Sequence, residues 1–199
     1  MEVPINLTFT DTLSKIQAVQ TLNFSPGRRR SWMIEAFPQE ANQLTTILDK
    51  TDFYEAPAST KYHGAYVGGL FDHSMNVACV LKYLTSIGVC NKWQDSRSPV
   101  IVGVLHDFTK LGMYKEDEQD LDKFQINPSR VSYGGHGSDS LIKILQVLAL
   151  TPEEAICIRY HMGAYEKEDW DGFDRAIKAY PNVLWTHTAD MYASKVLEV

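Results

Sequence analysis

The sequence has few cysteines, no excess of positive charge and no long apolar run. Its three cysteines, Cys79, Cys90 and Cys157, form no CxxC pair, so we expect free thiols in a reducing compartment. The formal net charge of −6 argues against a protein that coats nucleic acid through a general basic field. No stretch has the length of a membrane span or the layout of a signal peptide. We therefore expect a cytoplasmic protein with no membrane partner.

The remaining composition is that of a globular protein. The chain has 199 residues, of which 44% are hydrophobic and 22% are charged, and this length suits one domain with an appendage. We expect residues 1–60 to form an N-terminal helical extension packed on the core. Residues 61–199 would then form the main domain.

Periodicity and helix signals predict an all-α bundle. Apolar residues recur at helical spacing, and Pro152 suits the first turn of a helix. "EAPASTKYHGAYVGG" is typical of a loop. Acidic residues between "MYK" and "KFQIN" favour a short β-hairpin around residues 112–130. We expect helices near 8–24, 39–54, 70–88 and 98–111, from 136 and 152 onward, and near 181–197.

Two charged segments have open interpretations. Arg28, Arg29 and Arg30 follow a Pro-Gly turn signal, which favours a solvated loop over an anion-steering patch. "YEKEDWDGF", residues 165–173, is either a lid or an acidic surface loop.

A set of polar residues recurs inside apolar runs. In "VLHDFTKL" the pair His106-Asp107 is surrounded by hydrophobic residues, and burying either side chain without a partner is costly. Singly, each such histidine is more often a core or capping residue than a ligand. Together they form a metal-ligand set of the kind that bundle cores build from facing helices. The set comprises His73, His106, Asp107, His136, His161 and Asp190.

Imidazole and carboxylate ligands favour a divalent transition metal such as Mn, Fe, Co, Ni or Zn. The two-oxygen carboxylate of Asp107 is able to bridge two ions. Lys110 projects on the same side, where we expect it to face an anionic substrate group such as a phosphate. A solvated lysine near the helix end is the simpler alternative.

The ordered set of motifs resembles the HD-domain superfamily of metal-dependent phosphohydrolases. "GGLFDHS", "LHDFTK", "GGHG", "IRYHMG" and "AD" follow one another over roughly residues 60–195. They are similar to the HD domains of OB-fold-fused 3′→5′ exoribonucleases and of stand-alone bacterial and phage proteins. Thr109 stands where many members have glycine, so the pocket shape is expected to differ.

The resemblance implies a helical fold with a dinuclear metal site. One ion would use His73, His106, Asp107 and Asp190, and the other would use His136 and His161, with Asp107 bridging. The implied activity is hydrolysis of a phosphoester in a nucleotide or short oligonucleotide by a hydroxide that bridges the metals. A di-iron oxygenase and a nucleotide-sensing module without turnover are the alternatives. Homo-oligomer formation stays open.

Three further residues are candidates around this site. We expect His63 and Arg159 to contact substrate together with Lys110, although a structural role is an equal alternative for His63 and at least as good for Arg159. His187 precedes Asp190 by three residues and is a candidate to orient it, with a purely structural role as an equal alternative. Asp107 and Lys110 are the candidate catalytic residues.

Overall fold

The computed structural model describes residues 18–117, 120, 123–163 and 169–199. In this part of the chain it contains eight α-helices, one short 3₁₀ helix and one two-stranded antiparallel sheet. The predicted all-α class with a short hairpin is confirmed.

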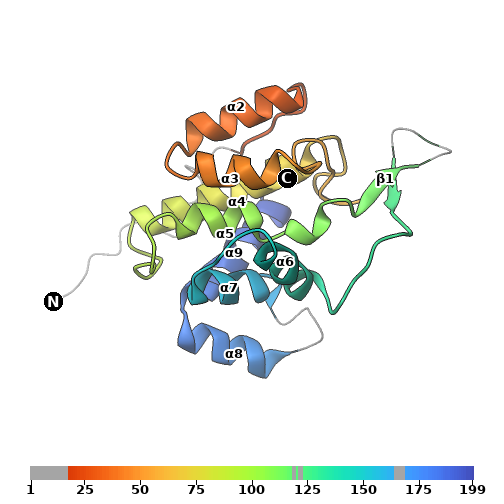
Figure 1. The fold of residues 1–199 in the computed structure, drawn as a ribbon. Coiled ribbons are helices and arrows are strands. Elements are labelled where there is room, and N and C mark those ends of the chain that lie inside the picture. The colour runs from red at the N-terminus through yellow and green to blue at the C-terminus, as the bar shows by residue number, and fades with distance from the viewer. Residues whose placement is uncertain (1–17, 118–119, 121–122, 164–168) are drawn as a thin grey trace.

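The helices form a bundle from which the hairpin projects (Figure 1). α2 and α3 lie on one side of it, and α8 lies on the opposite side. The α-helices are α2 (Pro26–Ala36), α3 (Ala41–Leu48), α4 (Gly69–Ser86), α5 (Ser98–Leu105), α6 (His136–Leu145), α7 (Pro152–Arg159), α8 (Trp170–Ala179) and α9 (Asn182–Lys195). The 3₁₀ helix η1 is Phe108–Lys110, and the strands are β1 (Tyr114–Glu116) and β2 (Phe124–Ile126).

Local sequence signals explain where several helices begin. The Ser25 side chain caps α2, and Pro26 occupies its first turn. Thr151 and Glu154 form a capping box at the start of α7, which satisfies backbone N–H groups that the helix leaves unpaired. The Asp169 side chain accepts from the Gly172 N–H at the start of α8. These helix starts are therefore set by short-range hydrogen bonds.

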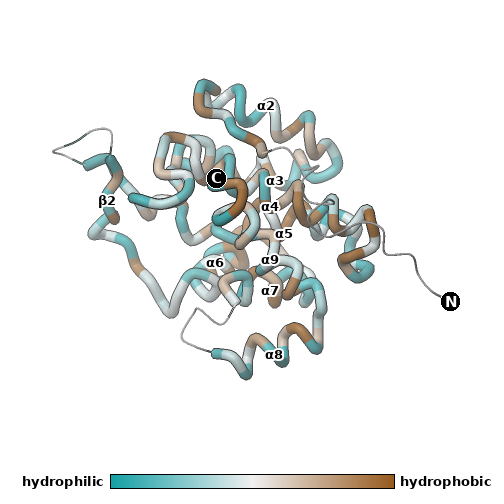
Figure 2. The backbone as a smooth tube through the Cα atoms, turned by 180° about the vertical axis from the view of Figure 1, so that it is seen from behind, coloured by the Kyte–Doolittle hydropathy of each residue, from teal (hydrophilic) through white to brown (hydrophobic). Residues whose placement is uncertain are grey.

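The core is centred on α4, which packs against α5 and α9. Most of α4 is buried, and every residue of α5 is buried. The peripheral helices α2 and α8 instead alternate between hydrophobic and hydrophilic residues (Figure 2). Among the buried polar candidates, His73 lies on α4, His106 at the end of α5 and Asp190 on α9, so they must be satisfied by one another or by a ligand.

The hairpin pairs Tyr114 with Ile126 and Glu116 with Phe124. It lies within the predicted range of 112–130. Because each strand has only three residues, the hairpin adds little to the core.

Three predictions about the fold are wrong in the described residues. The helix expected near 8–24 is absent from residues 18–24, and residues 1–17 lie outside the described part. Arg28–Arg30 are not in a solvated loop but in α2, where Arg29 is 1% exposed. Residues 170–173 begin α8 rather than a loop; residues 164–168 are not described. The apolar face of α2 is narrow, so its helical periodicity is weak, and this explains the error at Arg28–Arg30.

The proposed boundary near residue 60 stays a prediction. Phe37, Leu44 and Tyr54 belong to the same buried cluster as Phe71 and Leu81, so α2 and α3 share the core of the later helices.

In the described part of the chain, no helix combines the length and apolarity that crossing a bilayer would require.

Candidate metal centre

The chain changes from α-helix to 3₁₀ helix at the His-Asp pair. His106 still has helical dihedrals, whereas Asp107 has φ −99° and ψ 27°. In a 3₁₀ helix, residues three apart lie above one another, and this places Lys110 over Asp107. The Lys110 Nζ lies 2.7 Å from Asp107 Oδ2. Since Lys110 is only 7% exposed, its interpretation as a solvated helix-end lysine is wrong.

The first ligand cluster joins α4, the end of α5 and α9. His73 Nε2 and His106 Nε2 lie 3.1 Å apart. Asp190 Oδ1 lies 3.2 Å from His73 Nε2 and 3.9 Å from His106 Nε2. Asp107 Oδ2 lies 3.6 and 3.4 Å from the same two nitrogens. All four residues are buried, so four ligand atoms converge inside the bundle.

Main-chain oxygens fix which nitrogen each imidazole presents to this cluster. His106 Nδ1 lies 2.8 Å from the carbonyl oxygen of Gly103, and His73 Nδ1 lies 2.9 Å from the main-chain oxygen of Val199. Because these oxygens only accept hydrogen bonds, each Nδ1 must carry the proton. In the neutral rings, the two Nε2 lone pairs then point toward one another. That arrangement is repulsive unless a cation lies between them.

A second cluster lies on the other side of Asp107. Asp107 Oδ1 is 3.5 Å from His161 Nε2 and 3.9 Å from His136 Nδ1. All three atoms are buried and have no hydrogen-bond partner. His161 Nδ1 donates to the carbonyl oxygen of Ile158, at 2.8 Å, which again leaves Nε2 free for a ligand. The two oxygens of Asp107 thus serve two different groups of imidazoles.

Asp139 stabilises the loop that precedes His136 and positions its side chain. Its carboxylate accepts hydrogen bonds from Ser132 Oγ at 2.6 Å, Tyr133 N at 2.8 Å and Gly134 N at 3.0 Å. Gly135 then turns with φ 117°, a conformation that favours glycine. His136 follows as the first residue of α6. The hydrogen bonds to buried Asp139 therefore fix the backbone that leads into His136.

The electrostatics keep the carboxylates charged. Burial opposes ionisation of Asp107, but Lys110 and His106 outweigh it and lower its pKa well below the usual value. Burial likewise opposes ionisation of Asp190, where His73 provides the largest compensation and lowers the pKa. Burial lowers the pKa of His136, and it lowers the pKa of His63 to about 4. Two ionised carboxylates therefore lie in a centre where burial disfavours the charged forms of His63 and His136.

The residues present fit a divalent metal. Two groups each offer three ligand atoms within 4.8 Å of one another: His73, His106 and Asp190, and His106, Asp107 and His161. Ligands bound at about 2.1 Å to one ion lie roughly 3.0–3.4 Å apart, which is near the observed spacings. The unpartnered Asp107 Oδ1, His136 Nδ1 and His161 Nε2 point to the same conclusion. The centre is thus able to hold a metal ion.

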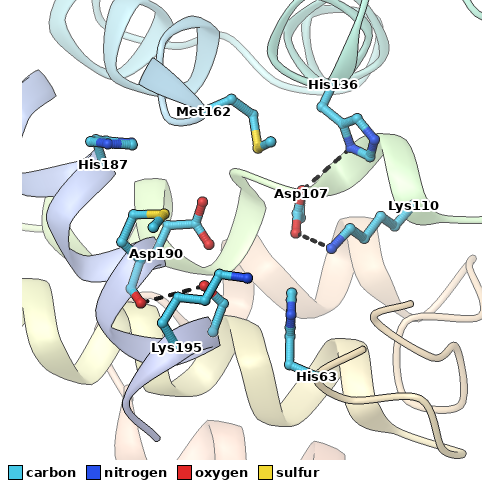
Figure 3. A pocket seen from close by; sticks show the side chains of 10 residues that line it. His63, Asp107, Lys110, His136, Met162, His187, Asp190 and Lys195 are labelled. Atoms are coloured by element: carbon cyan, nitrogen blue, oxygen red, sulfur yellow. Dashed lines mark hydrogen bonds and ion pairs between the residues drawn. The ribbon is translucent and has the colours of Figure 1, made fainter. Parts of the chain in front are cut away.

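Asp107, His136 and Asp190 line a cavity of about 340 Å³. Figure 3 shows Asp107 joined to His136 and to Lys110, with His63 and Lys195 below it in this view. Ten side chains line the cavity: His63, Asp107, Lys110, His136, Met162, His187, Asp190, Met191, Ser194 and Lys195. A small molecule that enters the cavity would therefore meet both carboxylates and two lysines.

The sequence interpretation missed four lining residues. Met191, Ser194 and Lys195 follow Asp190 at one, four and five positions, which places them on the same face of α9. This helical spacing from Asp190 could have identified them as neighbours of the site. Met162 follows His161, and no comparable pattern distinguishes it.

The three peripheral candidates have different positions. His63 lines the cavity, its ring centroid lies 5.0 Å from that of His73, and both of its nitrogens are buried without a partner. His187 also lines the cavity, but its Nδ1 donates to the main-chain oxygen of His161 at 2.8 Å. It therefore supports His161 rather than Asp190. Arg159 is not among the described lining residues, and its guanidinium packs on the Tyr160 ring.

Comparisons of this chain with family models, curated proteins and solved structures find no match. The functional interpretation therefore depends on the chemistry of the centre itself.

Proposed function

We propose that this protein is a metal-dependent phosphohydrolase of the HD-domain type that acts on a nucleotide or a short oligonucleotide. The observation that carries the proposal is that the two carboxylate oxygens of Asp107 face different groups of histidines. Its Oδ2 faces His73 and His106, whereas its Oδ1 faces His136 and His161. A buried carboxylate that serves two sets of imidazoles beside an open cavity suits a pair of ions.

His73, His106, Asp107 and Asp190 would hold one ion, and Asp107, His136 and His161 would hold the other. When bound, divalent ions supply this site with an activated water and with positive charge for a phosphate. The protein's part is to hold the six side chains at fixed positions. The hydrogen bonds from the Nδ1 atoms to main-chain oxygens do this for three of the four histidines.

Lys110 and His63 would receive the phosphate. Burial disfavours the charged form of Lys110, but Asp107 outweighs it and raises the lysine pKa, so the ammonium stays charged at neutral pH. Its remaining N–H groups are available to a phosphate oxygen. With a pKa of about 4, His63 is neutral near pH 7. It then offers one donor and one acceptor nitrogen to the substrate.

The cavity favours a small substrate. Its volume of about 340 Å³ is at the lower end of the range for small-molecule sites. Met162 and Met191 provide adaptable apolar contacts for a base or another apolar group. Together with the acidic net charge, this supports a nucleotide or the end of a short oligonucleotide as the substrate.

The test is hydrolysis of nucleoside mono-, di- and triphosphates, cyclic nucleotides and short RNA and DNA with added Mn²⁺. Asp107→Asn keeps the side-chain volume but removes the bridging charge, so we expect it to lose bound metal and turnover together. Asp174→Asn is the matched control, because Asp174 is an exposed acid of α8 that pairs with Lys178. We expect this control to match the wild type.

Metal-replete Asp107→Asn protein with full turnover would contradict the assignment. Wild-type protein that binds metal but hydrolyses nothing in the panel would exclude the proposed substrate class. In that case, iron-dependent O₂ consumption would identify the oxygenase alternative.

A further inference from the structure

The segment that follows α9 folds back toward the metal centre. The main-chain N–H groups of Val196 and Leu197 both donate to the Tyr192 carbonyl at 3.0 Å, and the Val199 N–H donates to the Ala193 carbonyl at 3.1 Å. Val199 is fully buried. Residues 196–199, hereafter the tail, are thus an ordered part of the core rather than a loose extension of the helix.

The fold-back depends on one unusual backbone conformation. Glu198 has φ 58°, the one positive φ among the described non-glycine residues. This left-handed conformation is unfavourable for residues with a Cβ. It persists where surrounding contacts over-determine it, and here the buried Val199 and its main-chain hydrogen bond provide those contacts.

The tail delivers the hydrogen-bond partner of His73. His106 and His161 each donate Nδ1–H to a carbonyl three residues earlier in their own segment. His73 instead donates to the main-chain oxygen of Val199, 126 residues away in sequence, at 2.9 Å. In metal sites, the partner of the second imidazole nitrogen fixes the ring and raises the basicity of the ligand nitrogen. For His73, this partner belongs to the tail.

We propose that the tail is a positioning element of the metal centre. The main-chain oxygen of Val199 sets the tautomer and orientation of His73, so docking of the tail and binding of a divalent transition metal by His73, His106 and Asp190 are coupled. The proposal rests on the metal centre described above. Because such coupling is reciprocal, the bound ion also stabilises the docked tail.

Substitutions at Glu198 separate this backbone effect from side-chain effects. Proline holds φ near −65°, so Glu198→Pro prevents the tail from folding back. Glycine adopts positive φ readily, so Glu198→Gly keeps the fold-back while also removing the carboxylate. Competition between the protein and a chelator for Zn²⁺ measures metal affinity. We expect Glu198→Pro to bind one ion about 10- to 100-fold more weakly and Glu198→Gly to match the wild type.

A second measurement reads the tautomer directly. In imidazole ¹⁵N NMR spectra of the metal-free wild type, we expect His73 to be protonated at Nδ1. We expect the same result for Glu198→Gly. The proline variant is expected to lose this signature.

The outcomes are distinct. Unchanged Zn²⁺ affinity of Glu198→Pro, or equal weakening in both variants, would overturn the coupling. A wild-type His73 protonated at Nε2 would also overturn it, and this readout remains if the proline variant does not fold. Wild-type protein that binds no Zn²⁺ would refute the metal centre, whereas the His73 tautomer in the same sample would still report on the tail contact.

Discussion

Arg29 is a buried cation whose hydrogen bonds all go to the protein. Its guanidinium donates to Thr21 Oγ1 at 2.8 Å and to the main-chain oxygens of Thr21, Tyr54 and Val67 at 2.8–3.0 Å. Thr21 in turn bonds to Asp72, the residue before His73. The arginine therefore has a structural role behind the start of α4 rather than one in steering anions.

We expect Arg29→Met to destabilise the protein by roughly 3–5 kcal/mol, because it leaves the buried oxygens of Thr21, Tyr54 and Val67 without their donor and removes the positive charge beside Thr21, which bonds to Asp72. Arg30→Met is the control, since Arg30 is exposed and pairs with Asp49 at the surface, where such pairs contribute little. Urea unfolding of both variants measures the difference. Equal stability of the two variants would contradict a structural role for Arg29.

At the scale of elements, α4 and α5 approach one another closely at a glycine. A Cβ on Gly103 would collide with the backbone of Ala78, whose nitrogen would lie 2.6 Å away. The carbonyl of Gly103 also accepts the hydrogen bond from His106 Nδ1. The same contact therefore sets the helix spacing and orients a ligand.

We expect Gly103→Ala to force α4 and α5 apart, lowering stability by about 1–3 kcal/mol and weakening metal binding through His106. Gly27→Ala is the matched control, because a Cβ there meets nothing within 4 Å, and we expect little change in either property. Thermal unfolding and chelator competition report the two effects. A Gly103→Ala protein with normal stability would contradict the close contact between α4 and α5 at this position.

At the scale of the whole molecule, burying the centre makes stability depend on pH. Burial lowers the pKa of His63 from 6.5 to about 4, so between these values the unfolded chain binds a proton that the folded chain does not. Stability of the metal-free protein therefore falls as pH drops from about 6.5 to 4. Below about pH 4, protonation of Asp107 and Asp190, whose pKa values are lowered, removes further stability.

We expect His63→Gln to flatten the loss of stability of chelator-treated protein between pH 6.5 and 4. The loss would not vanish, because the lowered pKa of His136 acts with the same sign. Urea unfolding at several pH values gives the slope. An unchanged slope in the variant would mean that His63 titrates normally in the folded protein.

Much of the centre was predictable because buried polar groups need partners. His73, His106, Asp107, His161 and Asp190 stood out as polar residues in apolar runs, and the fold brings them within a few ångströms of one another. Met162 was not predictable in this way. A methionine beside a helix end is an ordinary residue until a cavity forms next to it.

The sequence by itself determined the helical class, most helix positions and the polar set, because periodicity and capping act over a few residues. Only the tertiary structure decided three features: the pairing of Lys110 with Asp107, the burial of Arg29 and the contact of His73 with Val199. The last two join segments far apart in the chain, and the first depends on a switch to 3₁₀ geometry inside the packed core. Such contacts are set by how elements pack, and no local pattern records them.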